Sequence, residues 1–153
     1  MKENHIDAID VRILEELTSD ARISFVKLAK KLKVSNTLIH QRVKKLKDAG
    51  ILKKAIYQID PWTLGYQTSV YTQIMLTSAK QHREVEKELA KIPEIVECVN
   101  ISGRYALLVK IYAKNNRHLR DIIYEKIHAI EAIEGTNSTF SFETAFVRNV
   151  PFE

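Results

Sequence analysis

The sequence predicts an α+β protein in two parts, a helical N-terminal part and a C-terminal part with the element order β-α-β-β-α-β. Three observations lead to this prediction. Apolar residues recur with helical spacing up to about residue 50. From residue 67 onward, β-branched and aromatic runs alternate with amphipathic runs. Between them, "DPWTLGY" (60–66) contains a proline and a glycine, which interrupt regular structure. We therefore expect one domain over residues 1–59, a linker over 60–66 and a second domain over 67–153.

The N-terminal part contains three amphipathic stretches, each with one apolar side. These sides consist of Ile6, Ile9, Ile13, Leu14 and Leu17 in the first stretch, of Phe25, Leu28, Ala29 and Leu32 in the second, and of Ile39, Val43 and Leu46 in the third. Ser24 and Ser35 are the expected N-caps of the second and third helices, and Gly50 is the expected C-terminal cap. Only "KVS" (33–35) separates those two helices, so they must cross steeply. This spacing predicts a helix-turn-helix whose third helix reads DNA.

The residues after Gly50, "ILKKAIYQI" (51–59), alternate enough to predict a short strand or wing. We therefore expect a winged helix-turn-helix domain at the N-terminal end of the chain.

The excess positive charge lies entirely in this N-terminal part. The chain has 24 Lys and Arg against 19 Asp and Glu, and residues 1–60 contain 13 of the basic and 8 of the acidic groups. That segment therefore carries the whole net charge of +5. Between Lys27 and Lys54 the only acidic residue is Asp48. A dense stretch of one sign favours a polyanionic partner over a merely solvated surface.

The third helix presents polar side chains opposite its apolar side. Asn36, Thr37, His40 and Gln41 have the donors and acceptors that suit base edges, whereas lysines suit phosphates. Arg42 adjoins the buried side, so a structural ion pair with an acid of the first helix is as good an interpretation as a DNA contact. The predicted DNA-binding residues are Ser35, Asn36, Thr37, His40, Gln41, Arg42, Lys44, Lys45, Lys53 and Lys54.

In the C-terminal part, we expect four strands and two helices. The predicted strands are 67–77, 95–102, 105–113 and 136–150, and the predicted helices are 79–92 and 116–133. Right-handed crossovers then give a four-stranded antiparallel sheet with both helices on one face. The other face would carry Val70, Ile101, Leu107, Phe140 and Phe142, or their neighbours one residue along. A second copy of the chain is the simplest cover for that apolar face.

Several classes of function are disfavoured by the sequence. The five histidines and the single cysteine have no metal-ligand spacing, and no catalytic constellation emerges, so we expect neither an enzyme nor a cofactor. No apolar run approaches the roughly 18 residues of a membrane helix, and the first residues lack the apolar core of a signal peptide. We expect a cytoplasmic protein in which Cys98 is a free thiol buried in a strand.

These motifs resemble the leucine-responsive regulator/AsnC (Lrp/AsnC, feast/famine) family of transcriptional regulators over nearly the whole chain. The resemblance is carried by "IDAIDVRILEEL", "ARISFVKLAKKLKVSNTLIHQRVKKLKDAGIL", "IDPWTLGY" and "ECVNISGRYALLVKI". It is nearest to the asparagine-responsive branch. The resemblance implies a ferredoxin-like regulatory domain, a nucleoid-associated location, and dimers that assemble further, commonly into octamers. The turn between the second and third helices commonly carries glycine in the family, and this chain has Lys33 there.

The resemblance also implies an amino-acid pocket between dimers, beside the loop after the second predicted strand. We interpret Ser102-Gly103-Arg104-Tyr105 as a two-residue type II′ hairpin turn, which leaves Arg104 and Tyr105 without a structural task. The predicted effector-binding residues are Ser102, Gly103, Arg104, Tyr105, Ala106 and Glu143. Loop N–H groups and Arg104 would take a carboxylate, Tyr105 would form a wall, and Glu143 would meet the α-amino group or a polar side chain of the ligand.

The predicted function is therefore sequence-specific binding of double-stranded DNA, with assembly and binding that respond to a small effector, an amino acid. Alternatives are an amino-acid-sensing module that binds no DNA, and an architectural DNA-binding protein in which Arg104 and Glu143 pair across dimers without a ligand. A further alternative is an RNA-recognition motif, because a β-α-β-β-α-β sheet with Tyr105 on an inner strand is similar to one. The charge-neutral second part disfavours that alternative.

Overall fold

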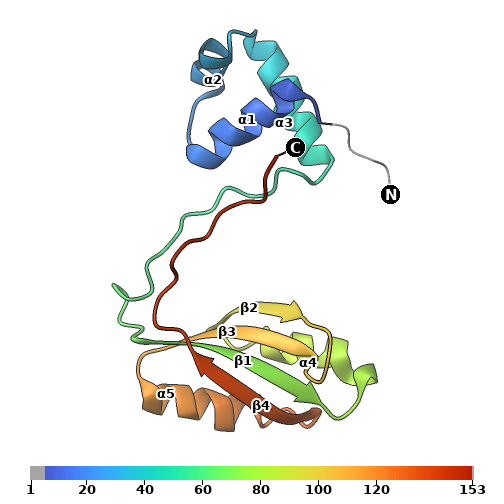
Figure 1. Ribbon diagram of the computed structural model, residues 1–153, viewed down its shortest axis with the longest axis vertical. Helices are drawn as coiled ribbons and strands as arrows, with labels where there is room; N and C mark the ends of the chain where they lie inside the picture. Colours follow the sequence, from blue (N-terminus) through green and yellow to red (C-terminus); the bar gives the residue numbers. More distant parts are fainter. Residues whose placement is uncertain (1–5, 153) are drawn as a thin grey trace. The chain divides into compact units, whose positions relative to one another are not determined.

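The computed structural model describes residues 6–152, which form two compact units (Figure 1). Residues 59–145 make up one unit, and residues 6–58 together with 146–152 make up the other. The sequence predicts a second domain that continues to the end of the chain. In the structure the last residues instead group with the helical unit, because Phe152 packs against its apolar core.

Three helices form the helical unit, and they are α1 (Ala8–Ser19), α2 (Phe25–Leu32) and α3 (Asn36–Asp48). The predicted apolar sides meet in one core, which buries Ile13, Leu14, Leu28, Ala29, Leu32, Ile39, Val43 and Leu46. Both predicted N-caps are confirmed. The Ser24 hydroxyl accepts from the backbone N–H of Lys27 at 3.3 Å, and the Ser35 hydroxyl accepts from that of Leu38 at 3.2 Å.

The C-terminal ends of α2 and α3 share one geometry. After α3, Gly50 adopts a left-handed conformation with φ of 72°, and the N–H of Ile51 donates to the carbonyl of Leu46 at 3.0 Å. This is the Schellman motif that the glycine predicts. After α2, Lys33 takes the glycine's place with φ of 57°, and the N–H of Val34 donates to Ala29 at 3.0 Å. Lys33 thus adopts after α2 the same left-handed turn that Gly50 adopts after α3.

The wing also differs from the sequence prediction. Residues 51–59 form no strand in the described chain, although their alternation predicts one. The helical unit offers no second strand among residues 6–58, so a ladder of backbone hydrogen bonds has no partner there. Ile56, Tyr57 and Ile59 are left exposed, while the Arg22 guanidinium lies 4.9 Å from the centroid of the Tyr57 ring.

The predicted linker contains an ordered turn. The Asp60 carboxylate accepts from the backbone N–H groups of Trp62 and Thr63, both at 3.1 Å, and from the Thr63 hydroxyl. Gly65 has φ of 84°, and the N–H of Tyr66 returns to the carbonyl of Pro61 at 3.0 Å. The Thr63 hydroxyl and the two N–H groups hold the pKa of Asp60 below its ordinary value, because they favour the charged carboxylate.

The second unit is an antiparallel sheet with the strand order β2-β3-β1-β4 and two helical segments packed on one face (Figure 1). The strands are β1 (Thr68–Leu76), β2 (Ile95–Asn100), β3 (Leu107–Ala113) and β4 (Ile133–Phe140). The first helical segment is a 3₁₀ turn (Ala79–Gln81) followed by α4 (His82–Leu89). The second is α5 (Asn116–Asp121), which continues as a π-helix (Ile122–Ile127). The element order is the predicted one.

The register decides which residues face the helices. Val70 pairs with Ile111, and Ile74 pairs with Leu107; all four lie in the core with α4 and α5. Val70 and Leu107 therefore do not lie on the open face. The sequence predicts either these residues or their neighbours one position along for that face. The period of two along each strand puts their neighbours there instead.

The open face carries an aromatic and cationic group near its centre. The Lys110 ammonium lies 5.2 Å from the centroid of the Tyr71 ring and 5.3 Å from that of Tyr112, and Leu108 follows the same side of β3. These four side chains are half-buried in a single chain.

The last strand ends earlier than predicted. β4 pairs with β1 from Ile133 to Phe140, and one more bond joins the N–H of Ser141 to the carbonyl of Ser69 at 2.8 Å. Thr68, the first residue of β1, pairs with Ala113 of β3 but not with β4, and residues 141–152 form no strand. The preceding helix also ends early, at Ile127, because the chain must turn back to start β4. In the part of the chain that the structure describes, no helix is long and apolar enough to cross a membrane.

Candidate nucleic-acid interface and effector loop

Helix α3 is fixed on one side and exposed on the other. Ile39, Val43 and Leu46 are buried against α1 and α2. The predicted base-reading residues all lie exposed on the remaining surface, together with one lysine, and they are Asn36, Thr37, His40, Gln41 and Lys44. Ser35 is exposed as well, but its hydroxyl oxygen already serves as the N-cap. The structure thus assembles a polar surface on α3 of the kind that reads base edges.

The sequence left two roles open for Arg42, a DNA contact and a structural ion pair with an acid of the first helix. The structure shows the ion pair. Its guanidinium lies 2.5 Å from the Asp7 carboxylate and 3.3 Å from that of Asp10. Asp7 is also the N-cap of α1, where it accepts from the N–H groups of Ile9 and Asp10. The backbone bond from Asp10 and the bond from Arg42 hold the pKa of Asp7 below its ordinary value.

Asp10 of α1 is a buried carboxylate for which the sequence alone indicates no specific partner. Its side chain is 0% exposed, and it pairs with the Lys45 ammonium at 2.9 Å as well as with Arg42. Lys45, predicted to be a phosphate contact, is thereby tied to α1, although 49% of its side chain is exposed. The Asp7-x-x-Asp10 spacing is the signal that reveals the capping box, in which the Asp10 carboxylate accepts from the Asp7 N–H at 3.3 Å.

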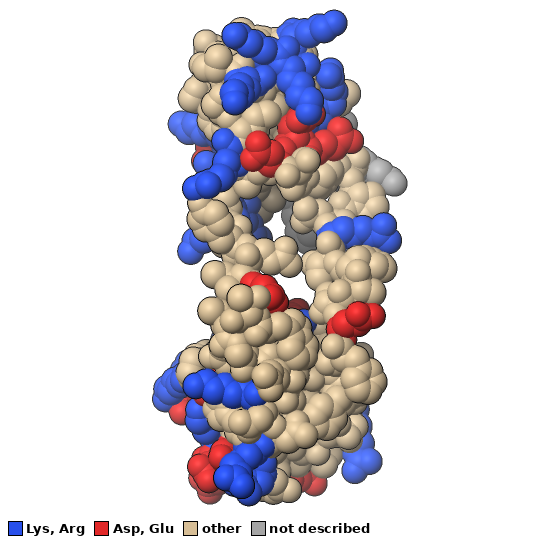
Figure 2. All heavy atoms as spheres, turned by 90° about the vertical axis from the view of Figure 1, so that its left-hand side faces the viewer, with Lys and Arg blue, Asp and Glu red and all other residues tan. Residues whose placement is uncertain are grey.

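Lys44, Lys53 and Lys54 are exposed, as a phosphate contact requires. Lys44 lies on α3, and the other two follow its C-terminal turn. Basic side chains gather over the helical unit in Figure 2, with a smaller group of acidic side chains beside them, whereas both signs mix over the sheet unit. The surface of the helical unit fits a polyanion.

The predicted effector loop is wider than a two-residue turn. The strands stay paired as far as Ile101 and Ala106, where the Ile101 N–H donates to the Ala106 carbonyl at 3.0 Å, and 102–105 form the loop. Gly103 adopts φ of 111°, which favours glycine, and the chain needs two more residues to reverse direction than a type II′ turn allows.

The side chains of that loop are accessible. The Arg104 guanidinium lies 6.0 Å from the centroid of the Tyr105 ring, and Arg104 is exposed. Glu143 lies beyond β4 in the irregular segment and is exposed as well. Within the described residues, no hydrogen bond or ion pair joins Arg104 to Glu143. A single chain therefore brings Ser102, Gly103, Arg104, Tyr105 and Ala106 together, but it does not bring Glu143 to them.

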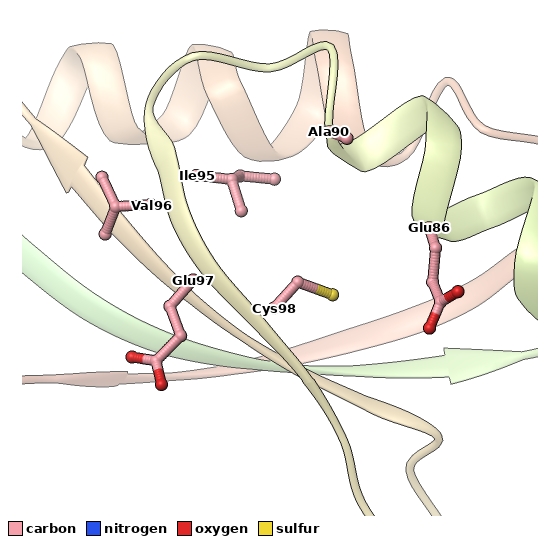
Figure 3. A pocket seen from close by; sticks show the side chains of 6 residues that line it. All are labelled: Glu86, Ala90, Ile95, Val96, Glu97 and Cys98. Atoms are coloured by element: carbon pink, nitrogen blue, oxygen red, sulfur yellow. The ribbon is translucent and has the colours of Figure 1, made fainter. Parts of the chain in front are cut away.

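A shallow hollow of about 360 Å³ lies between α4 and β2, lined by Glu86, Ala90, Ile95, Val96, Glu97 and Cys98 (Figure 3). No residue of the effector loop lines it. Cys98 lies in a strand as predicted, but it is exposed and not buried, because β2 is an edge strand. Its partial enclosure and the Glu86 carboxylate raise the pKa of the Cys98 thiol, which disfavours the reactive thiolate. Among residues 6–152, no group of three His, Cys, Asp or Glu side chains could hold a metal ion.

The fold and these surfaces define a class of protein. A helix-turn-helix unit with an exposed polar helix is joined to a separate β-α-β-β-α-β unit with an accessible loop, which is the construction of a DNA-binding transcriptional regulator with a ligand-binding domain.

Comparisons with known proteins identify the family. Residues 69–151 match the Lrp/AsnC ligand binding domain, and residues 6–53 match a winged helix-turn-helix DNA-binding family. The chain is 33% identical over 147 residues to the regulatory protein AsnC of Haemophilus influenzae, covering 96% of this chain and 98% of that one. It is 32% identical over 149 residues to AsnC of Escherichia coli K12, covering 97% and 98%. The chain belongs to the Lrp/AsnC family of transcriptional regulators.

Solved structures agree with this assignment. The structure of E. coli AsnC superimposes with a TM-score of 0.89 at 31% identity, covering 96% of this chain and 99% of that one. A transcriptional regulator of Neisseria meningitidis, solved as a complex with L-Met, shares the fold with a TM-score of 0.85 at 19% identity and 97% coverage of both chains. The relatives are transcriptional regulators and not enzymes, and the same holds for this chain.

Proposed function

We propose that the protein binds specific double-stranded DNA sequences as a symmetric dimer and that a small effector, an amino acid, controls this binding. The main support is the placement of α3. Buried apolar residues anchor one side of this helix, and the other side exposes Asn36, Thr37, His40 and Gln41. Two copies would place their α3 helices in successive major grooves about 34 Å apart. The target is then an imperfect palindrome in the DNA of the cytoplasm.

The DNA test uses exposed lysines that have no role in holding the helical core. Lys44→Ala combined with Lys53→Ala should weaken binding to every duplex and lower the slope of log K against log salt by about 2, because each phosphate contact contributes about 1. Binding is measured by fluorescence anisotropy of a labelled random-sequence duplex at several salt concentrations. Lys45 is left intact because it is paired with Asp10.

The matched control removes two lysines from the sheet unit, Lys87→Ala with Lys91→Ala. They change the net charge equally but lie on or directly after α4, paired with Glu84 and Glu88. The control should leave the salt slope unchanged. Equal slopes for the Lys44 and Lys53 double variant and the wild type would show that this surface does not contact DNA.

For the effector, we propose that the loop 102–106 supplies one side of a pocket and a neighbouring copy supplies Glu143. The support is that Arg104 is exposed beside Tyr105, while Glu143 of the same chain makes no ion pair with it. A guanidinium matches a carboxylate with two parallel hydrogen bonds, and Glu143 suits an α-amino group. A ligand that bridges copies shifts their assembly, from dimers toward an octamer, and so shifts DNA binding through linked equilibria.

A thermal-shift screen of the twenty amino acids tests this pocket. A ligand at a hundred times its dissociation constant adds about 2.7 kcal/mol of stability to the folded state. Arg104→Ala should abolish the shift, whereas Arg83→Ala, which removes an exposed arginine from α4, should keep it. If no amino acid shifts the wild type, or if the shift persists in the Arg104 and Glu143 double alanine variant, the pocket is wrong and a direct Arg104–Glu143 pair between copies is favoured.

A further inference from the structure

The exposed surface of α3 contains one ring that a neighbouring helix holds. The His40 imidazole and the Phe25 ring lie edge to face, with their centroids 4.8 Å apart and their planes at 82°. Phe25 is the first residue of α2, which Ser24 caps, and it packs against the helical core. His40 is exposed on α3, among the residues proposed to read bases. The Phe25 ring of α2 therefore lies against His40, one of the residues of α3 that we propose to read bases.

This contact restricts the orientation of the imidazole. An exposed histidine on a helix is free to choose among several staggered rotamers and a broad second torsion. An edge-to-face contact at about 4.5–7 Å is a preferred geometry for aromatic pairs and selects one of them. Phe25 is itself held, because Ser24 caps its helix and the helix buries Leu28, Ala29 and Leu32 in the core shared with α3. The ring of His40 is therefore pre-organised before any DNA arrives.

Pre-organisation matters most for a group that reads a base edge. A hydrogen bond to a base depends on direction, so a ring that rotates freely discriminates poorly between bases. The major-groove edge of a purine presents N7 as an acceptor at a fixed place, and a ring N–H of histidine is a suitable donor. Phosphate contacts by lysines have no such requirement, because they position the protein without reading sequence.

We propose that Phe25 is a positioning residue for sequence readout: it holds the His40 ring so that one ring N–H donates to N7 of a purine at one position of each half-site. This inference rests on the proposed DNA binding by α3. Phe25 acts through His40 and does not itself need to touch the DNA. The specificity of the regulator is then set partly by the first residue of α2, outside the recognition helix.

The test is selection from a duplex library with a randomised 24-base-pair core, using the full chain. The wild type, Phe25→Leu, His40→Ala and a control, Val26→Ala, are compared. Val26 is the next residue of α2 and is 54% exposed, so the control removes apolar bulk from the same turn without touching the ring pair. Phe25→Leu should lose base preference at the same half-site position as His40→Ala and at no other, while Val26→Ala should select the wild-type motif.

Two further measurements separate a positioning role from a merely structural one. Phe25→Tyr retains the ring contact and should restore the wild-type preference. Replacing the purine at the affected position by its 7-deaza analogue should weaken the wild type by roughly 10-fold, the lower part of the range for a specific base contact. The same replacement should leave the affinities of Phe25→Leu and His40→Ala unchanged.

The outcomes are distinct. A Phe25→Leu motif identical to that of the wild type, or changed at positions that His40→Ala leaves intact, overturns the inference while DNA binding stands. A wild type that enriches no motif overturns the proposed function and this inference with it. Circular dichroism melts establish that each variant is folded. If Phe25→Leu does not fold, Phe25→Met takes its place, because methionine keeps apolar volume in the core without a ring.

Discussion

At the scale of single residues, the charged groups that look alike in the sequence have different tasks in the structure. Arg42 and Lys45 belong to the same basic stretch as Lys44, but they pair with the buried carboxylate of Asp10. The basic stretch therefore contains lysines that we propose to contact DNA and, in addition, residues that anchor α3 to α1. A charge count describes the first task, while only the packing of α1 against α3 reveals the second.

Asp10→Ala should destabilise the helical unit by about 2 kcal/mol, because it removes the charged hydrogen bonds that the buried carboxylate accepts from the Asp7 N–H, Arg42 and Lys45. Glu15→Ala is the matched control, since Glu15 is an exposed acid of the same helix, and it should cost less than about 0.5 kcal/mol. Urea denaturation of both variants at one protein concentration measures the difference. Equal effects of the two substitutions would contradict the anchoring role of Asp10.

Glu94 carries a prediction about pH. Burial of this carboxylate, whose side chain is 12% exposed, raises its pKa. The Lys126 ammonium, with Nζ 2.9 Å from both carboxylate oxygens, and His118 more than offset that effect, so the pKa of Glu94 lies below its ordinary value of 4.5. A carboxylate with a depressed pKa in the folded state adds stability above its unfolded pKa and loses it as the pH falls toward the folded value.

The stability difference between the wild type and Glu94→Gln should therefore be present at pH 6 and shrink as the pH falls below about 4.5, the ordinary value for a glutamate. Denaturant midpoints of both proteins between pH 6 and pH 3 measure it. A difference that stays constant over this range would show that the Glu94 pairs contribute nothing to folding.

At the scale of elements, the helix ends define where the helix-turn-helix begins and turns. Serine hydroxyls cap α2 and α3 at their N-termini, and both helices end in a left-handed residue that lets the chain turn sharply. At Gly50 that conformation has no steric cost, whereas at Lys33 the Cβ atom meets the backbone. The sequence pattern located both turns, and the structure shows that they are the same motif.

Lys33→Gly should stabilise the protein by about 1 kcal/mol, because it removes the strain of a non-glycine residue in the left-handed region. Lys30→Gly makes the same chemical change inside α2, where the conformation is helical, and should destabilise by about 1 kcal/mol. Thermal melts of the two variants give opposite shifts if this account is right. If Lys33 also reaches a phosphate, Lys33→Gly lowers the salt slope of DNA binding by about 1.

At the scale of the whole molecule, a single chain leaves apolar surface without a cover. The open face of the sheet carries Leu108 and Lys110 with Tyr71 and Tyr112, and residues 141–152 form no helix or strand and leave Phe142 and Phe146 exposed. Surfaces of this kind are usually interfaces between copies. We therefore expect assembly to involve the sheet face, as the sequence pattern also predicted.

Leu108→Glu should convert the proposed dimer into a monomer, because a carboxylate placed on a covered face of the sheet loses its hydration. Light scattering should give about twice the chain mass of 17.7 kDa for the wild type and one chain mass for the variant. Val96→Glu, on edge strand β2, is the control and should remain dimeric. A wild type that scatters as a single chain at micromolar concentration would contradict the dimer itself.

The sequence by itself determined the element order, the three-helix core, both serine caps and the polar surface of α3. These features depend on local spacing and on cap chemistry, which short stretches of residues carry. The sequence could not decide which face of the sheet Val70 and Leu107 would take, because a shift of one residue in register reverses the face. Nor could it assign Arg42, place Cys98 at an exposed edge, or reveal that Phe25 lies against His40. Those features depend on which distant residues meet, and only the tertiary structure brings them together.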